Sequence, residues 1–193
     1  MITQLRGRLV EINPTNVVID CNGVGYWVNI SLNTYSVIEH EELITIYTHL
    51  IVREDAHILY GFVTKSERDV FLKLISVNGV GPASGMMMIS TLSVQEIVNA
   101  IATDDVKMLQ SVKGIGAKTA QRIIIDLKDK LDSSSIIVTN SGIDKNKSKN
   151  EALSALEVLG IPKKSAEKVM DKILSDYPEA EVEFLVKETL KKI

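Results

Sequence analysis

A short glycine motif occurs twice in this chain and constrains its fold more than any other feature of the sequence. The pattern valine, any residue, glycine, apolar residue, glycine fills residues 77–81 and again 112–116. Apolar residues at helical spacing lie on both sides of each copy. A glycine can end a helix in the left-handed backbone region, so that a second helix follows after a tight turn. The sequence therefore predicts two similar hairpins, each between two helices.

The same motif indicates an anion as ligand. Its second glycine lets a ligand approach the backbone, and the next helix offers free N–H groups and the positive end of its dipole. A DNA phosphate is the anion that we expect, and contacts of this kind read no bases. The residues expected at DNA are Gly79, Val80, Gly81 and Ser84 in the first copy and Gly114, Ile115, Gly116, Lys118, Thr119 and Arg122 in the second.

Two other interpretations of the motif compete with DNA binding. The glycines could serve only to stop helices, but the matched flanks and the basic Lys118 and Arg122, one turn apart, favour an anion site. Residues 116–119 also resemble the end of a nucleotide-binding P-loop. That loop needs glycine directly before its lysine and again five residues earlier, where this chain has Ala117 and Val112. We therefore expect no ATP site.

The first two segments differ in their pattern. Residues 1–63 hold short β-branched and aromatic runs separated by Gly, Pro and Asn, which predicts five strands in a small barrel of the OB-fold type. Residues 64–131 are predicted to be all helical. Two of these helices begin with a capping box, one from Thr64 to Glu67 and one from Ser93 to Glu96.

The remaining residues are predicted to form a linker and a small helical domain. Residues 132–150 are rich in Ser, Asn and Lys and predict a flexible linker. Residues 151–193 carry three short apolar stripes at helical spacing, separated at Gly160 and Pro178, which predicts a three-helix bundle. The predicted fold class is thus multi-domain, β followed by α.

The distribution of charge places any DNA contact in the middle of the chain. The whole chain has a net charge of −3. Residues 63–131 hold 9 basic and 7 acidic side chains, whereas residues 1–62 hold 3 basic and 7 acidic ones. A phosphate backbone is therefore expected to meet the middle segment and not the first.

The sequence suggests no catalysis, metal or cofactor. One cysteine, Cys21, excludes an internal disulfide and a four-cysteine zinc site. His40, His49 and His57 lack metal-ligand spacing, and the common nucleophile and metalloprotease motifs are missing. No apolar run reaches the ~18 residues of a membrane span, and the N-terminus lacks a signal-peptide core. We therefore predict a cytoplasmic protein with no catalytic residue, no metal, no cofactor and no membrane contact.

One acidic loop needs a separate interpretation. Residues 53–55, Arg-Glu-Asp, lie between two apolar strand runs in a predicted hairpin. From the residues alone, the favoured interpretation is a solvated turn.

Several stretches are similar to one known family. The start of the chain, residues 23–26 (GVGY) and residues 48–62 (THLIVREDAHILYGF) resemble the RuvA family of bacterial Holliday-junction-binding proteins. The resemblance continues through residues 78–82 and 114–120 and ends at 152–160, so it spans all segments in order.

The resemblance implies an OB-fold barrel, a tandem helix-hairpin-helix DNA-binding domain and a mobile, UBA-like three-helix domain. It implies a homotetramer, or an octamer of two stacked tetramers, that holds four-way junction DNA open. A hexameric ATPase motor of the RuvB type would drive branch migration, and a RuvC-type resolvase is a further implied partner. The chain would then be a non-catalytic subunit that serves recombination, repair and the SOS response to DNA damage.

The resemblance also assigns roles to residues. Glu54 and Asp55 match the acidic pin of the family, which would place eight carboxylates of four copies at the junction centre. The last domain would bind the motor. Its candidate contact residues are Leu156, Leu159 and Ile161, although each could instead belong to the core of the bundle.

The chain departs from the family pattern at two positions. Ala83 and Ala117 stand where many members have lysine. We therefore expect the first hairpin to depend more on backbone N–H groups, and overall affinity to be lower.

A rival from another class also agrees with the sequence. A pair of hairpins could belong to a general duplex-binding protein or to a nuclease accessory whose last domain recruits another protein. A junction binder prefers four-way DNA to linear duplex, and the rival does not.

Overall fold

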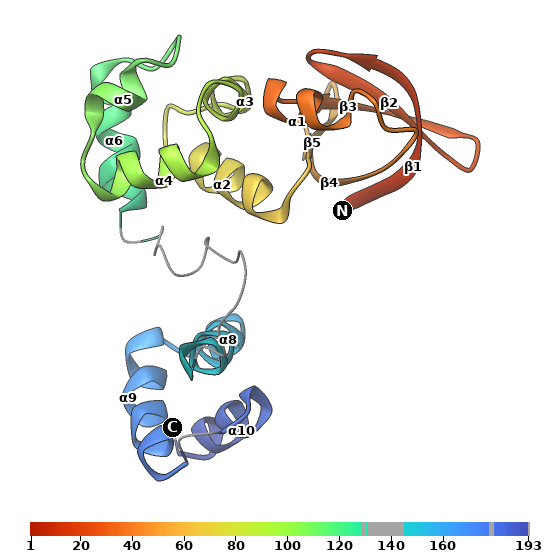
Figure 1. Ribbon diagram of the computed structural model, residues 1–193. Coiled ribbons are helices and arrows are strands. Elements are labelled where there is room, and N and C mark those ends of the chain that lie inside the picture. Colours follow the sequence, from red (N-terminus) through yellow and green to blue (C-terminus); the bar gives the residue numbers. More distant parts are fainter. Residues whose placement is uncertain (129, 131–144, 178–179, 193) are drawn as a thin grey trace. The chain divides into compact units, whose positions relative to one another are not determined.

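The computed structural model describes most of the chain, namely residues 1–128, 130, 145–177 and 180–192. The chain divides into two compact units, residues 1–138 and 139–193 (Figure 1). The first unit contains a barrel and a helical region, and the second contains helices only. Of the predicted linker, residues 132–144 lie outside the described residues.

Five strands form the barrel, which confirms the predicted OB-like domain. They are β1 (Gln4–Asn13), β2 (Asn16–Cys21), β3 (Val24–Ile30), β4 (Leu43–Val52) and β5 (His57–Phe62). Their order around the barrel is β1-β2-β3-β5-β4, and only the pair β3 and β5 is parallel. Alternate side chains point inward, so that the core contains Leu5, Val17, Ile19, Val28, Ile30, Ile44, Ile46 and Leu59.

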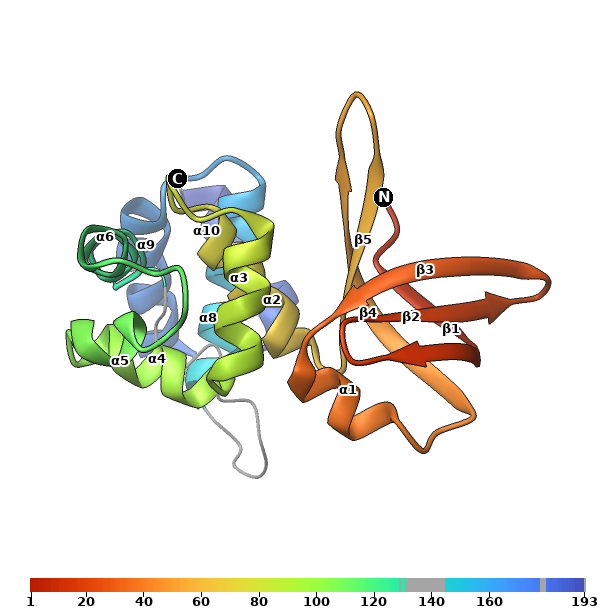
Figure 2. The same cartoon turned by 90° about the horizontal axis from the view of Figure 1, so that it is seen from above.

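A short helix, α1 (Leu32–Ile38), connects β3 to β4. The hydroxyl of Ser31 caps it by accepting from the N–H of Thr34 at 3.0 Å. The sequence pattern does not indicate this helix, because seven residues are too few to show an apolar stripe at helical spacing. It lies beside the helical region in Figure 2.

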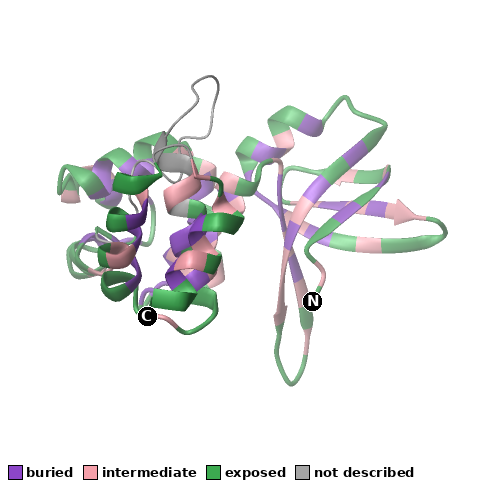
Figure 3. Ribbon diagram, turned by 90° about the horizontal axis from the view of Figure 1, so that it is seen from below, coloured by how far each residue is buried: buried purple, intermediate pink, exposed green. Residues whose placement is uncertain are grey.

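The helical region follows β5 directly. Its elements are α2 (Lys65–Ile75), α3 (Pro82–Thr91), α4 (Val94–Ala102), α5 (Val106–Gln110) and α6 (Ala117–Leu127). Figure 3 shows buried residues both on the strands of the barrel and on the helices. Large fully buried side chains of this core include Phe71, Leu74, Met88, Ile97, Ile101, Leu109, Ile123 and Leu127.

One of the two predicted capping boxes forms completely and the other only in half. At α4, Ser93 and Glu96 cap each other's backbone N–H groups. At α2, Thr64 accepts from the N–H of Glu67 at 3.1 Å, as expected. The carboxylate of Glu67, however, accepts from the N–H of Val63 at 3.2 Å and turns toward α1.

None of the described helices is long and apolar enough to cross a membrane alone. Among the described helices, α3 and α4 are long and apolar enough only when taken together, and that pair is bent by 102°. Met88, Ile89, Ile97 and Ile101 of these two helices are buried in the helical core.

The second unit packs α8 (Lys145–Val158), α9 (Lys163–Asp176) and α10 (Val182–Lys192) around one small core. Helix α8 begins at Lys145, within the predicted linker, and the Lys149 ammonium reaches the carboxylate of Asp171 on α9 at 2.6 Å. Gly160 ends α8 at φ +85°, and the N–H of Ile161 bonds to the carbonyl of Leu156 at 3.0 Å. This is the Schellman helix stop that the glycine predicts.

Candidate nucleic-acid interface

The two glycine motifs adopt the same backbone geometry. Gly79 and Gly114 have φ angles of +92° and +91°. The N–H of Val80 bonds to the carbonyl of Val77 at 3.0 Å, and the matching bond from Ile115 is 3.1 Å long. These turns join α2 to α3 and α5 to α6, so they are the predicted hairpins. The first glycine of each motif is required because L-residues are strained at such a φ.

The apolar residue between the glycines belongs to the protein core. The side chains of Val80 and Ile115 are only 4 % and 5 % exposed. Each residue therefore anchors its turn to the helices. This limits the role predicted for both residues at DNA.

The fold of the chain does not itself require the second glycine of each motif. Gly81 and Gly116 have φ angles of −84° and −82°, which any residue adopts. A Cβ atom built at either position meets no other atom within 4 Å. Neither the backbone conformation nor packing within the described residues requires glycine at these two positions.

The helices that follow begin without a side-chain cap. Gly81 is the N-cap of α3 and Gly116 is the N-cap of α6, and neither helix start has a capping hydrogen bond from a side chain. The first backbone bonds of the helices run from Gly85 to Gly81 and from Ala120 to Gly116, each at 2.9 Å. The earlier N–H groups therefore point out of the helix, as an anion site needs.

The two helix starts differ in what they offer an anion. In α3 the first residue is Pro82, which has no N–H, and Ala83 follows. In α6 the corresponding residues are Ala117 and Lys118. The second hairpin thus supplies one more backbone donor and one more exposed cation.

Arg122 connects the two hairpins. Its side chain is exposed on α6, and Nη1 donates to the carbonyl of Asn78 in the first motif at 3.3 Å. Lys118 is also exposed and lies with Arg122 on the wall of a shallow depression. The structure thus brings both hairpins and both predicted basic residues together. The sequence does not indicate Asn78 as the partner of Arg122, because the two are far apart along the chain.

The acidic loop is the tip of the β4–β5 hairpin. Val52 pairs with His57, and the N–H of Arg53 closes the turn on the carbonyl of Ala56 at 2.8 Å. Glu54 and Asp55 are both exposed. Figure 2 shows this hairpin extending well beyond the rest of the barrel. A long ribbon of this kind can bring two carboxylates to a point distant from its own domain.

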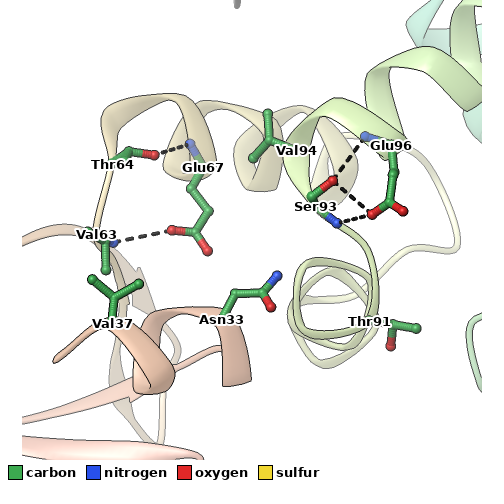
Figure 4. Close-up of a pocket in the computed structure, with 9 residues that line it drawn as sticks. All are labelled: Asn33, Val37, Val63, Thr64, Glu67, Thr91, Ser93, Val94 and Glu96. Carbon is green, nitrogen blue, oxygen red and sulfur yellow. Dashed lines mark hydrogen bonds between the residues drawn. The ribbon is translucent and has the colours of Figure 1, made fainter. Parts of the chain in front are cut away.

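Glu67 is a buried carboxylate that sequence reasoning assigns only to a helix cap. Its side chain lies between α1 and α2, with 7 % exposure, and accepts from the Ser31 hydroxyl at 3.1 Å. The Thr34 hydroxyl is 3.5 Å away. Burial raises the pKa of Glu67, and the hydrogen bonds from Ser31, Val63, Thr34 and Thr64 oppose that rise. Figure 4 contrasts it with Glu96, which turns back to its own Ser93.

The three residues predicted at the motor contact have different environments. Leu156 is fully buried in the core of the second unit, and Ile161 is half-buried against that core. Leu159 is 61 % exposed, and its neighbour Val158 is 88 % exposed. The exposed apolar pair of this region is therefore Val158 and Leu159, and Leu156 serves the bundle.

No group of three or more His, Cys, Asp or Glu side chains among the described residues is arranged to hold a metal ion. His49 lies on β4, where burial, and second the charge of Arg68, lowers its pKa. Its ring faces Phe71 at a centroid distance of 6.2 Å. The His49 ring therefore packs against α2 of the helical region. Its contacts indicate no role in binding a ligand.

A barrel followed by two matched hairpins, each with an uncapped helix start, defines a tandem helix-hairpin-helix protein of the kind that binds the DNA backbone. Family comparison agrees, because residues 71–129 match the SAM-like helix-hairpin-helix tandem. Residues 1–61 match the RuvA N-terminal domain, and residues 148–193 match the RuvA C-terminal domain. The chain belongs to the RuvA family.

Similar proteins support this membership over the full length. The chain is 54 % identical to the Holliday junction branch migration complex subunit RuvA of Christiangramia forsetii and 51 % identical to that of Flavobacterium psychrophilum. It is 44 % identical to the subunit of Bacteroides thetaiotaomicron. Each of these alignments covers 100 % of both chains.

Proposed function

We propose that this protein binds four-way junction DNA through its phosphate backbone and holds the junction open for branch migration. The observation that carries the proposal is the pair of N-cap glycines, Gly81 and Gly116, which the chain itself does not need. A phosphate that approaches the helix start would need them, because a side chain there would stand between the phosphate and the N–H groups. Contacts to phosphate make binding independent of sequence and sensitive to salt.

The acidic loops give the preference for a junction. In a four-fold assembly, four hairpin tips with Glu54 and Asp55 would meet at the crossover. Their charges repel the phosphates of strands that cross there and so favour an open, unstacked centre. A linear duplex has no such centre and gains nothing from the loops.

The second unit recruits the motor. It has its own core, and the exposed Val158 and Leu159 offer an apolar contact. A hexameric RuvB-type ATPase would bind there and hydrolyse ATP, while this chain remains non-catalytic. A RuvC-type resolvase would use the same open junction, in the cytoplasm, during recombination and repair.

Binding and mass measurements test this function. Purified protein is titrated against a four-way junction and a linear duplex of equal length, at several salt concentrations, and light scattering gives the mass of each complex. We expect tighter binding to the junction, affinity that falls with salt, and four or eight chains for each junction. Equal affinity for junction and duplex would support the general duplex-binding alternative instead.

A further inference from the structure

The first turn of α1 joins the barrel to the helical region through polar contacts on two helices. The Asn33 amide donates to the carbonyl of Ile89, near the end of α3, at 2.6 Å. The backbone N–H of Leu32 donates to the hydroxyl of Ser90 at 3.1 Å. On the other side, Ser31 and Thr34 meet the carboxylate of Glu67 on α2. We call this set of residues, 31–34 with 67, 89 and 90, the α1 contact.

Glu67 occupies a special place in the α1 contact. It accepts from the N–H of Val63, in the short connection where β5 passes into α2. One carboxylate therefore holds both this connection and the helix of the barrel that packs against it. A change in the angle between barrel and hairpins would have to break these hydrogen bonds.

The contacts between the two parts outside the α1 contact are packed rings or lie nearer the surface. Phe71 of α2 stacks against Phe62 at 5.0 Å and Tyr60 at 5.2 Å. The half-buried Arg68 guanidinium donates to the carbonyl of the exposed Thr3 at 3.3 Å. Apolar burial is non-directional, whereas a hydrogen bond weakens steeply when its angle changes. The buried bonds of Glu67 are thus the contacts best suited to fix an orientation.

We propose that Glu67 is a positioning residue that fixes the acidic loop of the barrel relative to the two hairpins and thereby sets the preference for junction over duplex. The inference rests on the proposed function. Duplex binding uses the hairpins alone, so it should tolerate rotation of the barrel. Junction binding needs hairpins at phosphates and acidic loops at the crossover together, so it should not.

Three variants of the full chain separate positioning from stability. Glu67→Leu removes every acceptor, and Thr34→Val is a milder change on the barrel side. Glu67→Gln keeps an acceptor for Val63 and a group that bonds to the hydroxyls, so it should restore the wild-type preference. Glu96→Ala is the matched control, because Glu96 holds the same capping-box position and bonds only within its own box.

The first readout is the ratio of junction affinity to duplex affinity. We expect Glu67→Leu to reduce it about tenfold, the effect of about one lost buried hydrogen bond, with duplex affinity unchanged. Thr34→Val should reduce the ratio less, and Glu67→Gln and Glu96→Ala should leave it intact. An unchanged ratio in folded Glu67→Leu, or a loss that Glu67→Gln shares, would overturn the inference. A wild-type ratio near one would instead overturn the proposed function.

A second readout needs no DNA and tests orientation directly. Spin labels are placed at Asp55→Cys and Ala83→Cys, with Cys21→Ser, in a chain assembled with an excess of unlabelled chain, and the distance distribution between the two labels of one copy is measured. We expect one narrow distribution in the wild-type background and in Glu67→Gln. Glu67→Leu should broaden or shift it, and so should Thr34→Val if the Leu variant does not fold. If the distance distributions of Glu67→Leu and Thr34→Val both stayed narrow and unshifted, a positioning role would be contradicted even if the ratio of junction to duplex affinity changed.

Discussion

At the scale of single residues, the two glycines of each hairpin are present for different physical reasons. Gly114 has a φ of +91°, whereas Gly116 has an ordinary φ of −82° and open space around it. The sequence motif predicts the position of both, but only the structure separates their reasons. The backbone angle makes the first a folding requirement, whereas the second is the glycine that we propose admits a phosphate.

The same substitution at both positions tests this difference. We expect Gly114→Ser to destabilise the fold by about 1–2 kcal/mol, because an L-residue enters the left-handed region. Gly116→Ser should leave stability equal or raise it, because serine is a favoured N-cap. Its hydroxyl would accept from the free N–H groups of α6, so junction affinity should fall by at least about 1.5 kcal/mol. Thermal unfolding and junction titration measure the two effects, and a Gly116→Ser protein that binds normally would refute a phosphate at this helix start.

Glu67 and Glu96 illustrate how far local sequence can predict a side chain. Both occupy the last position of a capping box, and the pattern predicts the same role for each. In the structure, the carboxylate of Glu67 instead contacts the hydroxyls of Ser31 and Thr34. Local spacing does not indicate this, because the partners belong to another domain and meet only when the barrel docks.

The two glutamates should affect stability with opposite dependence on pH. Burial raises the pKa of Glu67 in the folded protein. Its contribution to the free energy of unfolding is therefore fully present below the unfolded pKa of about 4.3. This contribution is lost as pH rises through the folded pKa. The bonds from Ser93 lower the pKa of Glu96, so its contribution is present above about 4.3 and is lost as pH falls.

Urea unfolding of the two glutamine variants at a series of pH values tests this opposite pH dependence. Relative to wild type, Glu67→Gln should gain unfolding free energy as pH rises from about 4, because glutamine cannot ionise in the buried site. Glu96→Gln should lose it over the same range. Parallel curves for the two variants would contradict the assignment of these environments.

At the scale of elements, the sequence predicts those with strong periodic patterns and misses those without one. The five strands and the long helices follow from alternation and apolar stripes, and Gly160 predicts the end of α8. Helix α1 has too few residues to show a period. The start of α8 at Lys145 lies in a polar stretch that resembles a linker, but Lys149 bonds to Asp171 on α9. Tertiary contacts thus determine that α1 forms and that α8 begins at Lys145.

The unequal hairpins lead to a gain-of-function prediction. Ala83 is exposed one residue after Pro82, at the position that Lys118 holds in the second hairpin. Ala83→Lys should raise junction affinity several-fold at low salt. Each added lysine that reaches a phosphate should steepen the slope of log affinity against log salt by about 0.9. Gln95→Lys on α4 is the control for net charge, and an equal gain from it would show that the hairpin position has no special role.

At the scale of the whole molecule, two units with separate cores predict separable activities. A chain that ends at residue 138 keeps the barrel and both hairpins and removes α8 completely, whereas a cut at Lys149 would leave part of that helix. We expect the truncated chain to bind junctions within about threefold of the full chain, equivalent to roughly 0.7 kcal/mol. It should fail to stimulate a RuvB-type motor on the same DNA. A tenfold loss of binding would show that the second unit contacts the junction.

The acidic loop is where the assembly, more than the single chain, determines function. One chain presents two exposed carboxylates at the end of a long hairpin, which by itself is a solvated turn. Only several copies around one crossover would bring these charges within a Debye length of the central phosphates, about 10 Å at 0.1 M salt. The loops should then cost binding energy and supply selectivity. Replacing Glu54→Gln and Asp55→Asn together preserves the shape of the turn, which the bond from Arg53 to Ala56 closes.

We therefore expect this double variant to bind junction DNA equally or more tightly than wild type, to discriminate less between junction and duplex, and to migrate junctions at an altered rate with the motor. The difference from wild type should shrink as salt rises, because screening weakens the repulsion between exposed loops and phosphates. Titrations at low and high salt, with the number of bound chains checked by light scattering, provide the measurement. Weaker junction binding by a variant with intact assembly would mean that the carboxylates attract their target, through a bound cation or through base contacts, and the repulsive role would have to be abandoned.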